Sequence, residues 1–273
     1  MFQRQKWLWK APGHPANVIR MSLAEPTTHE PRSELARRGF AFVPSACGRS
    51  LLEQCGSLSD WNEFAASWNE LAPDAYLARH GLYRRRRHAV FTLASDGSSV
   101  REKHQPHYQS PRYNPLQGGI ERWFEPIATP IGAGPTLSSI LHFCANQFGW
   151  LSGGVLAWRT EIHQFRIEAR ADVPGQPTPE GVHRDGVDHV LVLLVKRSNI
   201  VSGTTTILSD DGKELGSFTL ADPLDMALVE DARVRHGVTP VHALDPALPA
   251  YRDVLVVTLL AKAWQQENLS SSG

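Results

Sequence analysis

The sequence is poor in cysteine, in net charge and in long apolar runs, and each shortage excludes a class of protein. Only three cysteines occur among 273 residues, at positions 47, 55 and 144, and none belongs to a CxxC pair. This odd and small number argues against a disulfide framework and fits a reducing compartment. Lys plus Arg and Asp plus Glu both number 28, so no overall field attracts nucleic acid or an anionic membrane.

Apolar runs are short throughout the chain. No stretch approaches 18 consecutive apolar residues, and the first residues, MFQRQKWLWKAPGHP, lack the apolar centre of a secretory signal. We therefore expect a cytoplasmic protein that neither crosses a membrane nor binds nucleic acid. The oligomeric state is not indicated by any pattern.

The first part of the chain has helical periodicity. Residues 1–30 contain three prolines and no sustained period, which predicts an N-terminal arm. A short helix is expected before Gly39, followed by a strand. Apolar residues in 59–71 recur at helical spacing after Ser59 or Asp60 as N-cap, with Trp61 and Trp68 as core residues. A second amphipathic helix is expected over 136–150, with Thr136 as its cap.

The pattern changes to strands after Gly153 and Gly154. The runs expected to form strands are 155–169, 189–197, 204–220 around an Asp-Gly turn, 225–231, 234–241 and 252–263. Helices followed by a series of short strands favour an α+β fold with a sandwich or barrel. We expect one domain over 31–265, with helical support over 31–150, a β-core from about 155 to 265 and a polar tail over 266–273.

The segment PEGVHRDGVDH, residues 179–189, has the spacing of two metal ligands. In a strand, His183 and Asp185 point to the same face, and the flanking glycines allow close approach of the backbone. His236, 53 residues downstream on an expected strand, would complete a 2-His-1-carboxylate triad of the kind found in non-haem Fe(II) oxygenases. His242 is the alternative third ligand, but it follows Pro240, where that strand should end.

Several arginines are candidates for binding anions. An oxygenase that uses 2-oxoglutarate needs a cation for the distal carboxylate, and Arg252 opens the apolar strand after the distal histidine. Its alternative role is a surface ion pair with its neighbour Asp253. In the run 84–87, alternate arginines of a strand would face opposite sides, so one or two could line a pocket.

Three further side chains could contact a small molecule. Gln164 and Arg166 share one strand face and are candidates for 2-oxoglutarate or substrate, with structural hydrogen bonding as the alternative. Arg122 could pair with a substrate carboxylate, although Glu121 and Glu125 offer local partners.

Six blocks of the chain resemble one enzyme family. They are YRRRRHAVF at 83–91, YNPLQGGIERWFEPI at 113–127, HQFRIEA at 163–169, PEGVHRDGVDHV at 179–190, KRSNIVSGTTTI at 196–207 and VRHGVTPV at 234–241. Together they resemble the 2-oxoglutarate/Fe(II) dioxygenase family that includes bacterial L-isoleucine hydroxylase. The resemblance implies a double-stranded β-helix, or jelly-roll, core that uses Fe(II), 2-oxoglutarate and O2.

The resemblance also implies residue roles and a substrate class. It gives His183, Asp185 and His236 as iron ligands and Arg252 as the 2-oxoglutarate anchor. The expected reaction is hydroxylation of a free L-amino acid with an aliphatic or cyclic side chain, such as isoleucine, leucine or pipecolic acid. A carrier- or peptide-bound amino acid is the alternative substrate. A metal-dependent isomerase or lyase, or a binding module on the same barrel, is the alternative function.

Overall fold

The computed structural model describes residues 31–78 and 83–262, so the expected N-terminal arm and C-terminal tail lie outside the described residues. Its helices are α1 (Pro31–Arg38), α2 (Ser45–Cys55), α3 (Trp61–Ala66), the 3-10 turn η1 (Ser67–Glu70), α4 (Ala75–Ala78), α5 (Thr129–Gly132) and α6 (Pro135–Leu151). Within the described ranges, none of these helices has the length and apolarity needed to cross a membrane.

A large antiparallel sheet forms the centre of the fold. Its strands run in the order β1-β10-β6-β13-β5-β3-β2, and β4 pairs with β3. Their bounds are β1 (Phe40–Val43), β2 (Ala72–Pro73), β3 (Arg84–Ala94), β4 (Ser99–Arg101), β5 (Ala157–Ala169), β6 (His189–Ser198), β10 (Met226–Glu230) and β13 (Ala250–Ala261). The long strands β5 and β13 pair along their whole lengths, so they fix the register of the sheet.

Smaller antiparallel pairings form the opposite wall. They are β11-β8-β9 and β12-β7, with bounds β7 (Ile200–Ser202), β8 (Thr204–Leu208), β9 (Glu214–Thr219), β11 (Arg235–Val238) and β12 (Val241–Ala243). His183 pairs with His236 in an isolated bridge, which joins the segment before β6 to this wall. The result is a jelly-roll core with supporting helices, so the expected α+β class is confirmed.

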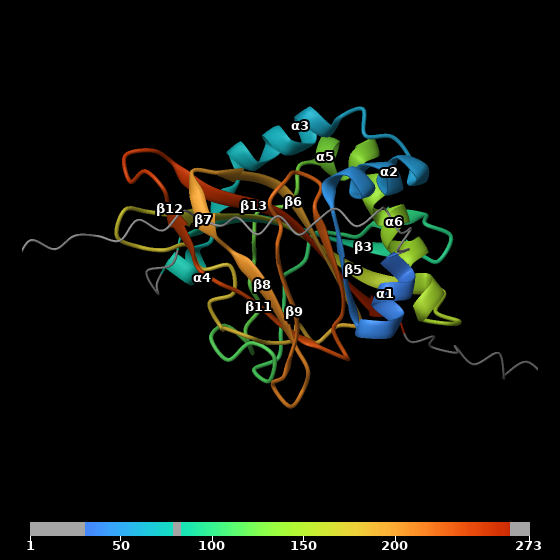
Figure 1. Ribbon diagram of the computed structural model, residues 1–273. Helices are drawn as coiled ribbons and strands as arrows, with labels where there is room; N and C mark the ends of the chain where they lie inside the picture. The colour runs from blue at the N-terminus through green and yellow to red at the C-terminus, as the bar shows by residue number, and fades with distance from the viewer. Residues whose placement is uncertain (1–30, 79–82, 263–273) are drawn as a thin grey trace, which may run out of the picture.

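Strand alternation divides the large sheet into two faces. Leu255, Val257 and Leu259 of β13 belong to the same core cluster as the buried face of α6. The intervening residues Val254 and Val256 point the other way, into the space between the sheets. In Figure 1 the helices α2 and α6 lie beside this large sheet, on the side away from β8, β9 and β11. The fold therefore has a helical layer, a large sheet and a small wall.

The helix boundaries differ from those expected. The helix predicted over 59–71 is α3 followed by η1, and Trp68 is fully buried as expected. The Asp60 side chain does not cap α3; its carboxylate accepts the Thr136 backbone N–H at 2.9 Å. Thr136 is consequently the second residue of α6, and Gly134 is its N-cap with Pro135 in the first helical position.

Helix α2 was not predicted from the sequence. Its interior contains Gly48, a residue of low helix propensity. A Cβ atom at this position would lie 2.4 Å from the Leu224 carbonyl oxygen, so tertiary packing requires glycine there. The glycine that this contact requires lowers the helix propensity of the segment, so the sequence pattern of α2 is weak.

Candidate functional site

A cavity of about 450 Å³ lies between the large sheet and the small wall. It is lined by the inward faces of β3, β5, β6 and β13, by β11, and by the segments 107–122 and 177–187. His183, Asp185, His236, Arg252 and Arg122 all reach this cavity, although they are up to 130 positions apart in the sequence. The fold thus gathers five of the residues that the sequence suggested.

His183, Asp185 and His236 present three ligand atoms to one point. These atoms all lie within 4.8 Å of one another. The Nε2 atom of His183 is 3.5 Å from one Asp185 oxygen, and the Nε2 atom of His236 is 3.6 Å from the other. Reciprocal backbone hydrogen bonds of 2.9 Å between His183 and His236 fix the two imidazoles side by side. Two imidazoles and one carboxylate form a donor set suited to Fe(II) with open positions.

The hydrogen bonding and the charges around His183 and Asp185 favour a bound cation. His183 Nδ1 lies 2.9 Å from the Gly181 carbonyl oxygen, so Nδ1–H donates there and the Nε2 lone pair is available to a metal. Burial opposes the charged form of His183, but Asp185 and Glu180 outweigh it and raise the pKa of the imidazole to about 9. Burial also opposes ionisation of Asp185, but His183 and His236 hold its pKa at about 2. A bound metal ion would replace the proton that these carboxylates attract.

Asp231 holds the turn that contains Asp185. Its buried carboxylate accepts backbone N–H bonds from Asp185, Gly186 and Val187 at 3.0, 2.8 and 3.2 Å. Gly186 has a φ of +81°, and a Cβ atom there would lie 2.4 Å from the Tyr113 ring. Glycine therefore meets both a backbone and a steric requirement at the position after Asp185.

An amide links Asp185 to a buried arginine. Gln109 Nε2 is 3.5 Å from an Asp185 oxygen, and Gln109 Oε1 accepts from Arg122 at 2.9 Å. Arg122 also donates to Gln117 at 2.6 Å. Arg122 thus pairs with two glutamine side chains rather than with the adjacent glutamates that the sequence offered.

Arg252 is a buried cation whose guanidinium group is only partly paired within residues 31–78 and 83–262. It is only 2 % exposed, and neither Nε nor one terminal nitrogen has a hydrogen-bond acceptor among these residues. Burial, with a smaller contribution from Arg197, lowers the pKa of Arg252 to about 10. An unpaired buried charge is costly, so a bound anion would complete this environment. The surface pair with Asp253 is not formed, since Asp253 binds Arg166.

Gln164 and Arg166 lie on the opposite face of β5. Gln164 donates to Ser67 at 2.8 Å, and Arg166 makes a bidentate pair with Asp253 at 2.8 and 2.7 Å. Neither residue lines the cavity. This placement argues against their expected contact with 2-oxoglutarate or substrate, because residues 163, 165 and 167 form the inward face instead. His242 is exposed on β12 and is not part of the triad cluster.

The arginine run behaves as strand alternation predicts. Arg84 and Arg86 line the cavity, whereas Arg85 points away and pairs with Glu168 at 2.6 Å. Sequence reasoning missed Glu180, whose carboxylate is 3.3 Å from His183 Nε2.

It also missed a cluster formed by His107, Glu161 and His163, which line the cavity, and by the fully buried His88. Glu161 and His163 are two residues apart, as His183 and Asp185 are, and this spacing is the sequence feature that could have indicated the cluster.

A jelly-roll core with a 2-His-1-carboxylate cluster in its cavity defines the class of non-haem iron oxygenases. The family model described as 2OG-Fe dioxygenase matches residues 65–258. The chain therefore belongs to the 2OG-Fe dioxygenase family and is an oxidoreductase that uses Fe(II), 2-oxoglutarate and O2.

Relatives with assigned activities are similar over much of the chain. A 3(1)-hydroxy-L-isoleucine 4-dioxygenase of Pantoea ananatis is 25% identical over 233 residues, covering 83% of this chain and 93% of the relative. An L-isoleucine-4-hydroxylase of Bacillus thuringiensis is 29% identical over 160 residues, covering 57% of this chain and 65% of the relative.

Solved structures support the same fold. The crystal structure of a BsmA homologue from Methylobium petroleophilum superimposes with a TM-score of 0.75 at 36% identity, covering 85% of this chain and 92% of that one. The crystal structure of IDO from Bacillus thuringiensis gives a TM-score of 0.66 at 20% identity, covering 89% of this chain and 99% of that one.

Proposed function

We propose that this enzyme hydroxylates a free L-amino acid with an aliphatic or cyclic aliphatic side chain. In this proposal His183, Asp185 and His236 hold Fe(II), and Arg252 binds the distal carboxylate of 2-oxoglutarate. The products are the hydroxy amino acid, succinate and CO2. Isoleucine, leucine and pipecolic acid are the first substrates to test.

The observation that carries the proposal is the shared cavity of the triad and Arg252. A guanidinium group with unpaired donors faces the same space as two imidazoles and a carboxylate. A dicarboxylate that chelates a metal at one end and reaches Arg252 at the other satisfies both sites. Arginine suits this role because its planar fork binds a carboxylate through two hydrogen bonds.

The bound iron and 2-oxoglutarate together supply the activation of O2 and the insertion of one oxygen atom into a C–H bond. The chain itself positions the reactants. Asp231 and Gln109 orient Asp185, and the Gly181 carbonyl sets the tautomer of His183. Apolar side chains of the large sheet exclude water and hold an aliphatic group; they are Val190, Val192, Val254 and Val256.

The names of the relatives support an amino acid as substrate. Two curated relatives are named for oxidation of L-isoleucine or of its hydroxylated form. The cavity volume of about 450 Å³ lies in the range of small-molecule sites. Because matching one methylene is worth only about 1–3 kcal/mol, we expect close homologues to be accepted as well.

The test is a succinate-release assay with the iron-loaded enzyme and a panel of free amino acids, combined with mass spectrometry. The expected result is succinate formation coupled to a gain of one oxygen atom on an aliphatic amino acid. Oxygen gain only on carrier- or peptide-bound amino acids would refute the free substrate and leave a hydroxylase. Turnover without O2 would refute the oxygenase reaction itself.

A further inference from the structure

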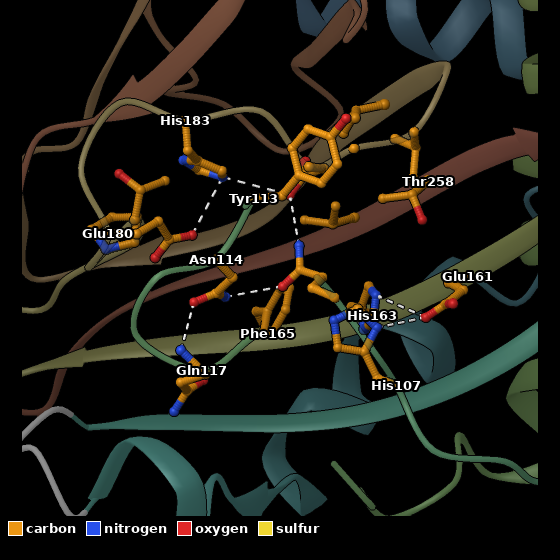
Figure 2. Close-up of a pocket in the computed structure, with 18 of the residues that line it drawn as sticks. His107, Tyr113, Asn114, Gln117, Glu161, His163, Phe165, Glu180, His183 and Thr258 are labelled. Atoms are coloured by element: carbon orange, nitrogen blue, oxygen red, sulfur yellow. Dashed lines mark hydrogen bonds and ion pairs between the residues drawn. The ribbon is translucent and has the colours of Figure 1, made fainter. Parts of the chain in front are cut away.

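A second cluster of polar groups lies beside the triad; three of its residues line the cavity, and the fourth, His88, is fully buried. One side-chain atom from each of His88, His107, Glu161 and His163 lies within 4.8 Å of the others. Glu161 and His163 are two residues apart on β5, so both lie on its inward face. His88 is the register partner of His163 on β3. In Figure 2, Glu161, His107 and His163 lie together on one side of the cavity, across from His183 and Glu180.

Glu161 is the common acceptor of this cluster. One carboxylate oxygen is 3.0 Å from His88 Nε2 and 2.6 Å from His107 Nδ1, and the other accepts from Arg159 at 3.0 Å. Burial raises the pKa of the Glu161 carboxyl, but the hydrogen bonds from His107 and His88 outweigh burial and hold it below its usual range. Glu161 is therefore an anion kept in place inside the cavity.

The hydrogen-bond partners determine which imidazole nitrogens carry protons. Arg86 donates to His163 Nδ1 at 2.8 Å, so that nitrogen is an acceptor and the proton of the neutral ring is on Nε2. His163 Nε2 lies 3.9 Å from the same Glu161 oxygen that accepts from the other two rings. Burial lowers the pKa of all three imidazoles, that of His107 to about 4. The neutral rings thus all direct an N–H toward Glu161.

This proton pattern favours an ammonium group over a divalent metal. A metal would need the lone pairs of nitrogens that now carry protons. His163 would then have to place a proton on Nδ1, against the Arg86 donor. His88 would place one on a buried Nδ1 that has no partner in the described part of the chain. The acceptors that the cluster still offers are the second Glu161 oxygen, which has a further lone pair beside the one that Arg159 uses, and His107 Nε2. A positively charged N–H donor matches both.

The cluster lies on the side of the metal centre away from Arg252. Arg252 is the register partner of Ile167, and Glu161 lies six residues before Ile167 on β5. At 3.3 Å per residue, these two positions on β5 are roughly 20 Å apart. His107 is two residues from Gln109, whose amide is 3.5 Å from Asp185. A substrate bound by Glu161 would therefore adjoin the triad without competing for the Arg252 end of the cavity.

We propose that Glu161, fixed by His88, His107 and Arg159, binds the α-ammonium group of the substrate amino acid. This inference rests on the proposed hydroxylation of a free amino acid and adds a reason for it. The site requires an unmodified amino group, so an N-acylated or peptide-bound residue would lack the charge that Glu161 recognises.

The test compares amino acids with their deamino analogues. Binding of L-isoleucine, of 3-methylpentanoic acid and of N-acetyl-L-isoleucine is measured by titration without O2, on enzyme loaded with Fe(II) and 2-oxoglutarate; L-leucine and 4-methylpentanoic acid form a second pair. The wild type should prefer the free amino acid by roughly 30-fold or more, the factor expected for a hydrogen bond between charged groups. Glu161→Gln should lose most of this preference while the affinity for 2-oxoglutarate stays unchanged.

Glu168→Gln is the matched control, because Glu168 is on the same strand but outside the cavity and pairs with Arg85. It should keep the preference. Equal wild-type affinity for the amino acid and its deamino analogue would overturn the ammonium site without any variant.

The site would also be overturned by a preference that survives in Glu161→Gln, or by two tightly bound metal ions per chain that fall to one in that variant. Turnover of free amino acids alongside such a result would leave the proposed function standing. Turnover confined to carrier- or peptide-bound amino acids would refute both.

Discussion

Arg252 is the residue whose environment depends most on a ligand. Its burial without full hydrogen bonding means that the folded protein carries an unfavourable charge until an anion binds. We expect Arg252→Ala to raise the 2-oxoglutarate concentration needed for half-maximal activity by roughly 100-fold or more. Arg252→Lys should recover only part of the affinity because an ammonium group lacks the planar fork. Activity measured over a range of 2-oxoglutarate concentrations tests this.

Arg166→Ala is the control for this prediction, since Arg166 pairs with Asp253 on the outer face of β5. Its 2-oxoglutarate requirement should match the wild type. A second readout needs no turnover. Added 2-oxoglutarate should raise the melting temperature of the metal-loaded wild type and have much less effect on Arg252→Met. An unchanged 2-oxoglutarate requirement in Arg252→Ala, together with a raised requirement in Arg166→Ala, would identify Arg166 as the residue that binds 2-oxoglutarate.

The triad makes a separate prediction at the residue scale. Replacing His183, Asp185 or His236 by Ala should weaken the binding of Fe(II) strongly. The loss should exceed the roughly 10–100-fold that is expected when a residue that only hydrogen-bonds to a metal ligand is removed. Coupled turnover should disappear while the β-rich circular dichroism spectrum is retained. Anaerobic metal titration provides the measurement. His242→Ala should bind metal normally, because His242 is exposed on β12; loss of metal there, with normal binding in His236→Ala, would reverse the assignment.

At the scale of elements, the turn between residues 183 and 187 depends on Asp231. Three backbone N–H groups of the turn converge on this one carboxylate, which comes from the segment between β10 and β11. We expect Asp231→Ala to lower the affinity for Fe(II) by roughly 10–100-fold, because the carboxylate ligand would lose its fixed orientation. Metal titration would show the lower affinity for Fe(II), and a Michaelis analysis in excess Fe(II) would show that activity is partly restored. Asp210→Ala, an exposed partner of Arg184, is the control and should bind metal as the wild type does.

Strand alternation explains which side chains of each element reach the site. On β5 the inward residues are Glu161, His163, Phe165 and Ile167, while Gln164 faces Ser67 in the helical layer. The sequence shows that Gln164 and Arg166 share a face, but it does not show which face the helices cover. That choice follows from the packing of α6 and η1 on the large sheet.

On the scale of the whole molecule, β13 joins the helical layer to the cavity. Leu255 is fully buried in the core cluster shared by the helices and the large sheet. We expect Leu255→Ala to lower the free energy of unfolding by about 2–5 kcal/mol, since the surrounding side chains cannot fill the space that is created. Urea denaturation gives the measurement. The exposed Leu248 is the matched control, and Leu248→Ala should change the free energy by no more than about 0.5 kcal/mol. Equal effects in the two variants would contradict this description of the core.

Local patterns in the sequence predict the class of fold and the residue types of the proposed metal site. Local periodicity separates helices from strands. The spacing of His183 and Asp185 marks them as candidate ligands, although the structure places them in an isolated bridge and the turn after it rather than in a regular strand. The alternation expected in the run 84–87 is found, with Arg84 and Arg86 toward the cavity and Arg85 away from it. Such periodicities are set by near neighbours in the chain.

The partner of each polar group follows from packing in three dimensions and not from the sequence pattern. Asp60 caps α6 instead of the helix that follows it, and Asp253 binds Arg166 and leaves Arg252 to the cavity. The Glu161 cluster combines β3, β5 and the segment near residue 107, so the local spacing of Glu161 and His163 shows only part of it. A buried hydrogen bond or ion pair forms between groups that packing brings together, and sequence separation places little limit on which groups those are.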